Sequence, residues 1–132
     1  MPEVIPASRY RQLAASARAI AGGQIVTEKV TGLGPDELRT LAQHTTGFLD
    51  AGHAVVVLGT EHDGKALLAA AVTRSLHDTG IEASRILIPA ARTIGGGAGG
   101  KGPVASAGGR RVEALGEALA IAAEDATRAL NQ

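Results

Sequence analysis

The stretch GGGAGGKGPVASAGG, residues 95–109, contains eight of the 18 glycines of this 132-residue chain. Helical patterns precede and follow it. Neither helix should continue through it, because each glycine lowers helix stability by roughly 1 kcal/mol relative to alanine. Glycine permits positive φ angles and a close approach of the main chain to a ligand or another chain. Exposed main-chain N–H groups bind anions such as phosphate or carboxylate. The stretch therefore predicts a glycine-rich loop, and we expect the functional site there.

The composition indicates one domain with an aliphatic core. A chain of 132 residues is long enough for a single core. Hydrophobic residues make up 45% of the sequence and aromatic residues 2%, so Leu, Ile, Val and Ala must build that core. A platform that stacks nucleic-acid bases on aromatic rings is therefore not expected. The 13 basic and 13 acidic residues cancel, so any nucleic-acid site must be a local patch.

The absence of cysteine excludes disulfides and thiolate metal sites, and it fits a cytoplasmic protein. No apolar run approaches the roughly 18 residues of a membrane span. The N-terminus lacks the basic start and apolar stretch of a secretory signal. We expect a cytoplasmic chain with no membrane contact.

Strand and helix patterns alternate along the first half of the chain. Residues 24–30 are β-branched and partly alternating, which predicts a strand. Pro35 suits the first position of a helix that extends to about residue 49. Residues 53–59, HAVVVLG, are continuously apolar, as in a strand covered on both faces. This order predicts a βαβ unit.

The second half adds a hairpin and more helices. Asp63-Gly64 is a strong turn signal and favours a returning strand over residues 66–72, although ALLAAAV is equally helical by propensity. Short helical patterns cover residues 73–79 and 83–94. Pro89 lies inside the second, so that helix either starts near Ile88 or kinks. Residues 104–107 suit a short strand, and residues 111–130 predict the final helix. We expect a single α/β domain with a mixed sheet of four or five strands, flanking helices and a glycine-rich loop.

The N-terminal residues have a helical pattern of their own. Residues 8–21 follow a helical pattern that Gly22 and Gly23 end. Its apolar side is thin and rich in alanine. It is either a small docking helix or the tail of a longer helical arm.

The run IGGGAGGKGPVASAGG, followed by EALGEALAIA, resembles the C-terminal domain of alanyl-tRNA synthetase, a member of the DHHA1 group. The resemblance extends over roughly residues 22–126. In the family motif, lysine is usual at Gly97 and glycine at Ala98, and Lys101 stands where arginine is usual. Pro, Asp, Met and Gln are common where this chain has Gly102, Pro103, Val104 and Ser106. By this resemblance, residues 1–21 are the remnant of a helical arm and residues 22–132 a DHHA1-like globular domain.

The resemblance implies a non-catalytic accessory domain that binds tRNA, alanine-specific in this family, at the elbow where the D and T loops meet. Neither the aminoacylation domain nor the HxxxH-type editing motif is present. Shape-led docking through phosphates and 2′-hydroxyls suits a domain poor in aromatic residues. The candidate nucleic-acid-binding residues are Gly95, Gly96, Gly99, Gly100, Lys101, Gly108, Gly109, Arg110, Arg111, Lys65 and Arg92. The alternative for the glycines is a tight structural crossing, and for the basic residues a solvated surface.

Other classes of function have weaker support. His44, His53, His62 and His77 lack metal-ligand spacing, and no serine has a nucleophile-elbow context. We therefore expect no metal, no cofactor and no catalysis by this chain. A protein-interaction or homo-oligomerisation module is the main alternative, because alanine-rich helices pack closely. An anion cradle for a small molecule or nucleotide ranks third, because the strand–GxGxxG–helix order is missing.

Overall fold

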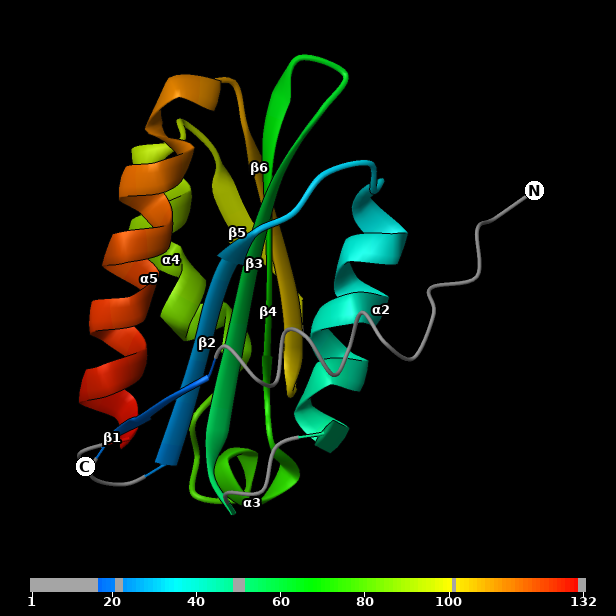
Figure 1. Ribbon diagram of the computed structural model, residues 1–132. Coiled ribbons are helices and arrows are strands. Elements are labelled where there is room, and N and C mark those ends of the chain that lie inside the picture. The colour runs from blue at the N-terminus through cyan, green and yellow to red at the C-terminus, as the bar shows by residue number, and fades with distance from the viewer. Residues whose placement is uncertain (1–16, 21–22, 49–51, 101, 131–132) are drawn as a thin grey trace.

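A mixed β-sheet forms the centre of the molecule, with helices on both faces (Figure 1). The computed structural model describes residues 17–20, 23–48, 52–100 and 102–130, and these residues form six strands. The strands are β1 (Arg18–Ile20), β2 (Gly23–Lys29), β3 (Ala54–His62), β4 (Lys65–Val72), β5 (Gly97–Gly99) and β6 (Val104–Gly109). The helices are α2 (Pro35–Thr45), α3 (Arg74–His77), α4 (Ala83–Thr93) and α5 (Leu115–Leu130), with 3-10 turns at Thr46–Phe48 and Val112–Ala114. The predicted α/β class is confirmed, with one strand more than the upper expectation.

The strand order is β1-β2-β3-β4-β6-β5. β2 and β3 are parallel, and α2 connects them, so the predicted βαβ unit is confirmed. All other neighbours are antiparallel. β1 and β5 are the two edges of the sheet within the described ranges.

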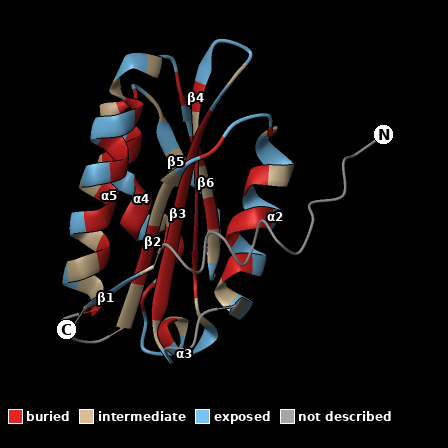
Figure 2. Cartoon of the chain, in the orientation of Figure 1, coloured by how far each residue is buried: buried red, intermediate tan, exposed pale blue. Residues whose placement is uncertain are grey.

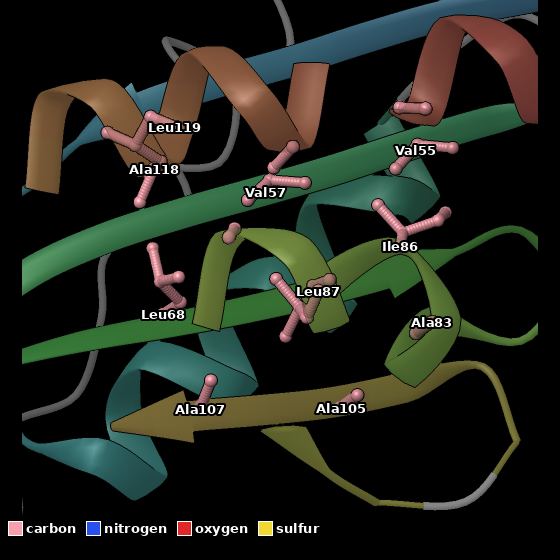
Figure 3. Packing of buried hydrophobic residues seen from close by; sticks show 14 of the residues in the cluster. Val55, Val57, Leu68, Ala83, Ile86, Leu87, Ala105, Ala107, Ala118 and Leu119 are labelled. Atoms are coloured by element: carbon pink, nitrogen blue, oxygen red, sulfur yellow. The ribbon is translucent and has the colours of Figure 1, made fainter. Parts of the chain in front are cut away.

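β3 carries the core on both of its faces. Successive side chains of a strand point to opposite faces. Val55 and Val57 therefore pack with α4 and α5 (Figure 3). Val56 and Leu58 pack with α2. Figure 2 shows most of β3 in the colour of buried residues. α5 crosses β3 closely at Gly59, where an added Cβ would lie 3.0 Å from Leu115 Cδ1. The continuous apolar run of the sequence is thus explained by a strand between two layers of helices.

The hairpin and the helix after it follow the turn chemistry of the sequence. Asp63 and Gly64 have φ angles of 51° and 75°, and the segment after them is a strand. The helical alternative for that segment is therefore wrong. α4 begins at Ala83 and contains Pro89, so the alternative start near Ile88 is also wrong.

The predicted N-terminal helix needs a correction. Arg18–Ile20 form β1, which pairs antiparallel with β2, with Arg18 opposite Ile25. Pairing with β2 gives these residues a place in the sheet through main-chain hydrogen bonds. A helix with a thin alanine-rich face would bury little apolar surface. Residues 8–16 and 21 of the predicted helix lie outside the described residues. The division into an arm and a globular domain stays a prediction.

The surface between α4 and α5 holds a partly buried carboxylate. Oδ2 of Asp125 is buried and has no hydrogen-bond partner within the described ranges. Burial raises the pKa of Asp125 above its ordinary value of 3.8; Arg128, 3.3 Å away, opposes this, and Glu124 adds to it. The folded chain therefore keeps a proton on Asp125 at pH values where the unfolded chain has lost it.

Replacing Leu87 by alanine should destabilise the fold. Leu87 is fully buried between α4 and the sheet (Figure 3). Truncating such a side chain costs about 2–5 kcal/mol of the free energy of unfolding. Ile88, the next residue, is 43% exposed, and Ile88→Ala should cost about 0.5 kcal/mol. Urea unfolding of the two variants measures both values, and equal losses would contradict this packing of α4.

Asp125→Asn should change how stability depends on pH. Because the folded pKa is raised, the contribution of Asp125 to stability falls as the pH rises from 3.8 through the folded pKa. Asparagine cannot ionise, so the variant should lack this fall and be at least as stable as the wild type near neutral pH. Urea unfolding across the acid range tests this, with the exposed Glu117→Gln on the same helix as control. A variant less stable than the wild type at neutral pH would refute it.

Candidate nucleic-acid interface

The glycine-rich segment forms a strand pair, so the predicted loop is wrong at Gly97–Gly99 and at residues 108–109. β5 pairs antiparallel with β6, with Gly97 opposite Gly108 and Gly99 opposite Ser106. β6 continues into the sheet by pairing with β4. The predicted short strand over residues 104–107 is confirmed and extends to Gly109. Residues with almost no side chain still form sheet hydrogen bonds, because those bonds use only the main chain.

Several of the candidate glycines are required by the packing of the hairpin itself. An added Cβ at Gly96 would overlap the carbonyl oxygen of Gly108, and one at Gly109 would overlap the carbonyl oxygen of Ile94. Gly95 and Gly100 have φ angles of 79° and 127°, which other residues rarely adopt. The N–H groups of Gly95 and Gly96 donate to carbonyls of α4, at 3.0 and 2.9 Å. These amides are therefore not available to an anion.

Gly97 and Gly99 are different, because nothing in the fold requires a glycine there. An added Cβ at either position would meet no atom within 4 Å, and neither φ lies in the left-handed region. Glycine in a strand costs about 0.5–1 kcal/mol relative to alanine. The internal packing gives no reason for that cost, so the space beside these two residues suits a close external partner.

The open space belongs to a groove between α2 and the β5–β6 hairpin. α2 packs on β3 and β4 and leaves part of β6 and β5 uncovered on that face (Figure 1). Two hollows of about 500 and 310 Å³ lie there, and they share Gly99 and Ser106, so we describe them together as the α2–hairpin groove. Its volume is within the roughly 300–1,000 Å³ of ligand pockets. Its polar and glycine lining includes Asp36, Arg39, Thr40, Gln43, Gly97, Gly99 and Ser106.

The wall of the groove is polar and its charges cancel. Asp36 and Arg39 form an ion pair one helical turn apart, and they are the only charged residues among the described residues that line the groove. Thr40, Gln43 and Ser106 have side chains with no hydrogen-bond partner in the described part of the chain. Their hydroxyl and amide groups can therefore bond to a ligand without breaking an internal bond.

Four of the predicted basic residues gather at one end of the sheet, which we call the basic end: Lys65, Arg92, Arg110 and Arg111. β4 starts at Lys65 where β6 ends, with Ala66 opposite Gly109. The main-chain N–H of Arg111 donates to Ile94 at 3.0 Å, which brings the segment after β6 against the end of α4. None of the four makes an ion pair with a described carboxylate, and the nearby Asp63 pairs with His62 instead.

The candidate glycines and basic residues therefore divide between the groove, the hairpin packing and the basic end. Gly99, Gly100 and Gly108 line the groove, whereas Gly95, Gly96 and Gly109 close the hairpin. Lys101 lies outside the described residues. Gly97 and the polar wall of α2 were not among the site residues predicted from the sequence. Two signals in the sequence would have found them. Gly97 and Gly99 lie two residues apart and so share one face of a strand, and residues 36, 39, 40 and 43 lie three or four apart and so share one face of a helix.

No group of three or more potential metal-ligating side chains occurs in the described residues. Within the same ranges, no helix is long and apolar enough to cross a membrane.

Alanine substitutions should separate the two kinds of glycine. Gly96→Ala and Gly109→Ala should lower the free energy of unfolding by about 1–3 kcal/mol or more, because the new methyl groups overlap main-chain atoms. Gly97→Ala and Gly99→Ala should leave it unchanged or raise it by up to about 1 kcal/mol. Urea unfolding measures all four, with Gly64→Ala, whose φ of 75° penalises alanine, as a reference. Equal losses in the free energy of unfolding at all four positions would contradict this division of the glycines into two kinds.

Comparison with known proteins agrees with this architecture. The DHHA1 domain family matches residues 22–127. The alanine–tRNA ligase of Anaeromyxobacter dehalogenans (strain 2CP-C) is 41% identical over 124 residues, which cover 94% of this chain and 13% of the ligase. The alanine–tRNA ligase of Bacillus pumilus (strain SAFR-032) is 39% identical over 100 residues, 76% of this chain and 11% of that ligase. The chain thus spans little more than a tenth of these relatives.

A solved structure shows the same fold. The C-Ala domain from Aquifex aeolicus alanyl-tRNA synthetase superposes with a TM-score of 0.70 over 84% of this chain and 97% of that domain, at 20% sequence identity. The family match covers most of the chain as well. The chain therefore belongs to the DHHA1 domain family and has the fold of the C-Ala domain of alanyl-tRNA synthetase.

Proposed function

We propose that this chain is a non-catalytic RNA-binding domain that docks on the elbow of tRNA through phosphate and main-chain contacts. The family membership and the similarity to alanine–tRNA ligases support tRNA as the partner, with alanine tRNA as the first candidate. Elbow docking is what the resemblance of the glycine-rich motif implies. Residues 22–132 form the binding domain in this proposal, and residues 1–21 the end of an arm.

The observation that carries the proposal is the unfilled space beside Gly97 and Gly99. These glycines weaken β5 without serving the internal packing, and they form part of the floor of the α2–hairpin groove. A nucleic-acid backbone can approach such a floor closely because no side chain projects from it. The bare main chain thus has a role even though the segment is a strand rather than a loop.

The basic end supplies unpaired positive charge, which the described lining residues of the groove do not. Lysine and arginine bind phosphates, and each phosphate contact releases counterions. Arg110 directly follows Gly109, and β6 leads from the groove to this end of the sheet. A single RNA segment in the groove can therefore continue toward the cations.

Removing one basic side chain should weaken tRNA binding and its dependence on salt. In filter-binding titrations, Lys65→Ala, Arg92→Ala or Arg110→Ala should each reduce affinity and lower the slope of log K against log salt by about 0.9. Arg74→Ala is the matched control, because Arg74 lies beyond the opposite end of β4 and should change neither value.

Docking on the elbow is tested with a shortened RNA in the same filter-binding titration. An RNA that keeps the acceptor stem but lacks the D and T loops should bind more weakly than the whole tRNA. If the unmodified domain shows no affinity for tRNA at low salt, the proposal is wrong. Self-association of such a domain in light scattering would then favour the oligomerisation alternative, for which the open edge of β5 provides a surface.

A further inference from the structure

We propose that the α2–hairpin groove binds the ribose edge of RNA through 2′-hydroxyl groups, while the phosphates bind at the basic end. The domain would then distinguish RNA from DNA without reading bases. This inference rests on the proposed function and assigns a different ligand chemistry to each half of the surface. Three features of the described residues support it.

The first feature is the strand geometry of the glycine segment. An anion cradle needs successive N–H groups that converge on one point. Along the open edge of an extended strand such as β5, N–H and C=O groups alternate. Phosphate oxygens only accept hydrogen bonds, so the carbonyls of that edge would repel them. A hydroxyl group both donates and accepts, and it can pair with either group.

The second feature is the charge of the groove. Asp36 and Arg39 neutralise one another, and the remaining polar side chains of the wall and floor are hydroxyls and an amide. Thr40, Gln43 and Ser106 can each donate and accept, which matches the 2′-hydroxyl. A groove for phosphates would need an unpaired cation in its lining, and none is present among the described lining residues.

The third feature is that the described residues of the groove lining include no aromatic side chain. Bases bound from a single strand usually stack on aromatic rings. The floor instead offers Gly97, Gly99 and Ser106, which are small and leave room for a sugar edge. The four unpaired cations lie outside the groove, at the basic end, where the continuing backbone would place its phosphates.

The test compares three versions of one hairpin with the sequence of the T arm of tRNA, one of the two arms that form the elbow: RNA, 2′-fluoro RNA and DNA. The 2′-fluoro version keeps the A-form shape but cannot donate from the 2′ position. The domain should bind RNA about tenfold more tightly than either analogue, equivalent to one or two hydrogen bonds. The salt dependence of RNA and 2′-fluoro RNA binding should be equal, because the phosphates are unchanged.

Variants separate the two halves of the surface. Ser106→Ala should reduce RNA affinity to the level of the 2′-fluoro version and leave 2′-fluoro binding unchanged. Gly99→Val, which fills the floor of the groove, should weaken binding of both RNA and 2′-fluoro RNA. Arg110→Ala should weaken binding of all three nucleic acids. Thermal unfolding confirms that Gly99→Val is folded, and Ser106→Ala serves independently of it.

Three outcomes decide the question. A clear preference for RNA that Ser106→Ala abolishes supports the inference. Equal binding of RNA and 2′-fluoro RNA overturns it while leaving the proposed function intact. No binding of any nucleic acid at low salt overturns both.

Discussion

The β5–β6 hairpin is held in place by close contacts between main-chain atoms, which only glycine permits. The methyl group of an alanine at Gly96 or Gly109 would overlap a carbonyl oxygen of Gly108 or Ile94. Because both positions lack a Cβ, β6 can lie between β4 and β5 while the segment after it reaches the end of α4. This close approach fixes the edge of the sheet, the floor of the groove and the position of the basic end.

The rest of the fold supplies the wall of the groove. β3 is buried on both faces, so it needs a helical layer on each side, and α2 provides the one that faces the groove. α2 presents Leu38 and Leu41 to the sheet and keeps Asp36, Thr40 and Gln43 on its polar side. One helix therefore closes the core and forms the polar wall. The other two long helices cover the far face and leave the groove open (Figure 1).

The sequence predicted the elements that local chemistry determines. The apolar run of β3, the Asp63-Gly64 turn and the proline start of α2 each specify one structure, and all three predictions are confirmed. Most of the glycine segment was predicted as a loop because glycine ends helices and allows unusual backbone angles. Pairing of β6 with β4 and β5 makes more of it a strand than predicted. The polar wall was missed because α2 and the hairpin are more than 50 residues apart, and only the tertiary fold brings them together.

The central claim is that a bare strand floor and a neutral helix wall form the surface that contacts RNA. Chemical-shift mapping of the isotopically labelled domain during a titration with tRNA tests it most directly. The largest shifts are predicted at the amides of Gly97, Gly99 and Ser106, on the polar side of α2, and at the basic end. Large shifts confined to the outer surface of α4 and α5, with the groove amides unchanged, would contradict it.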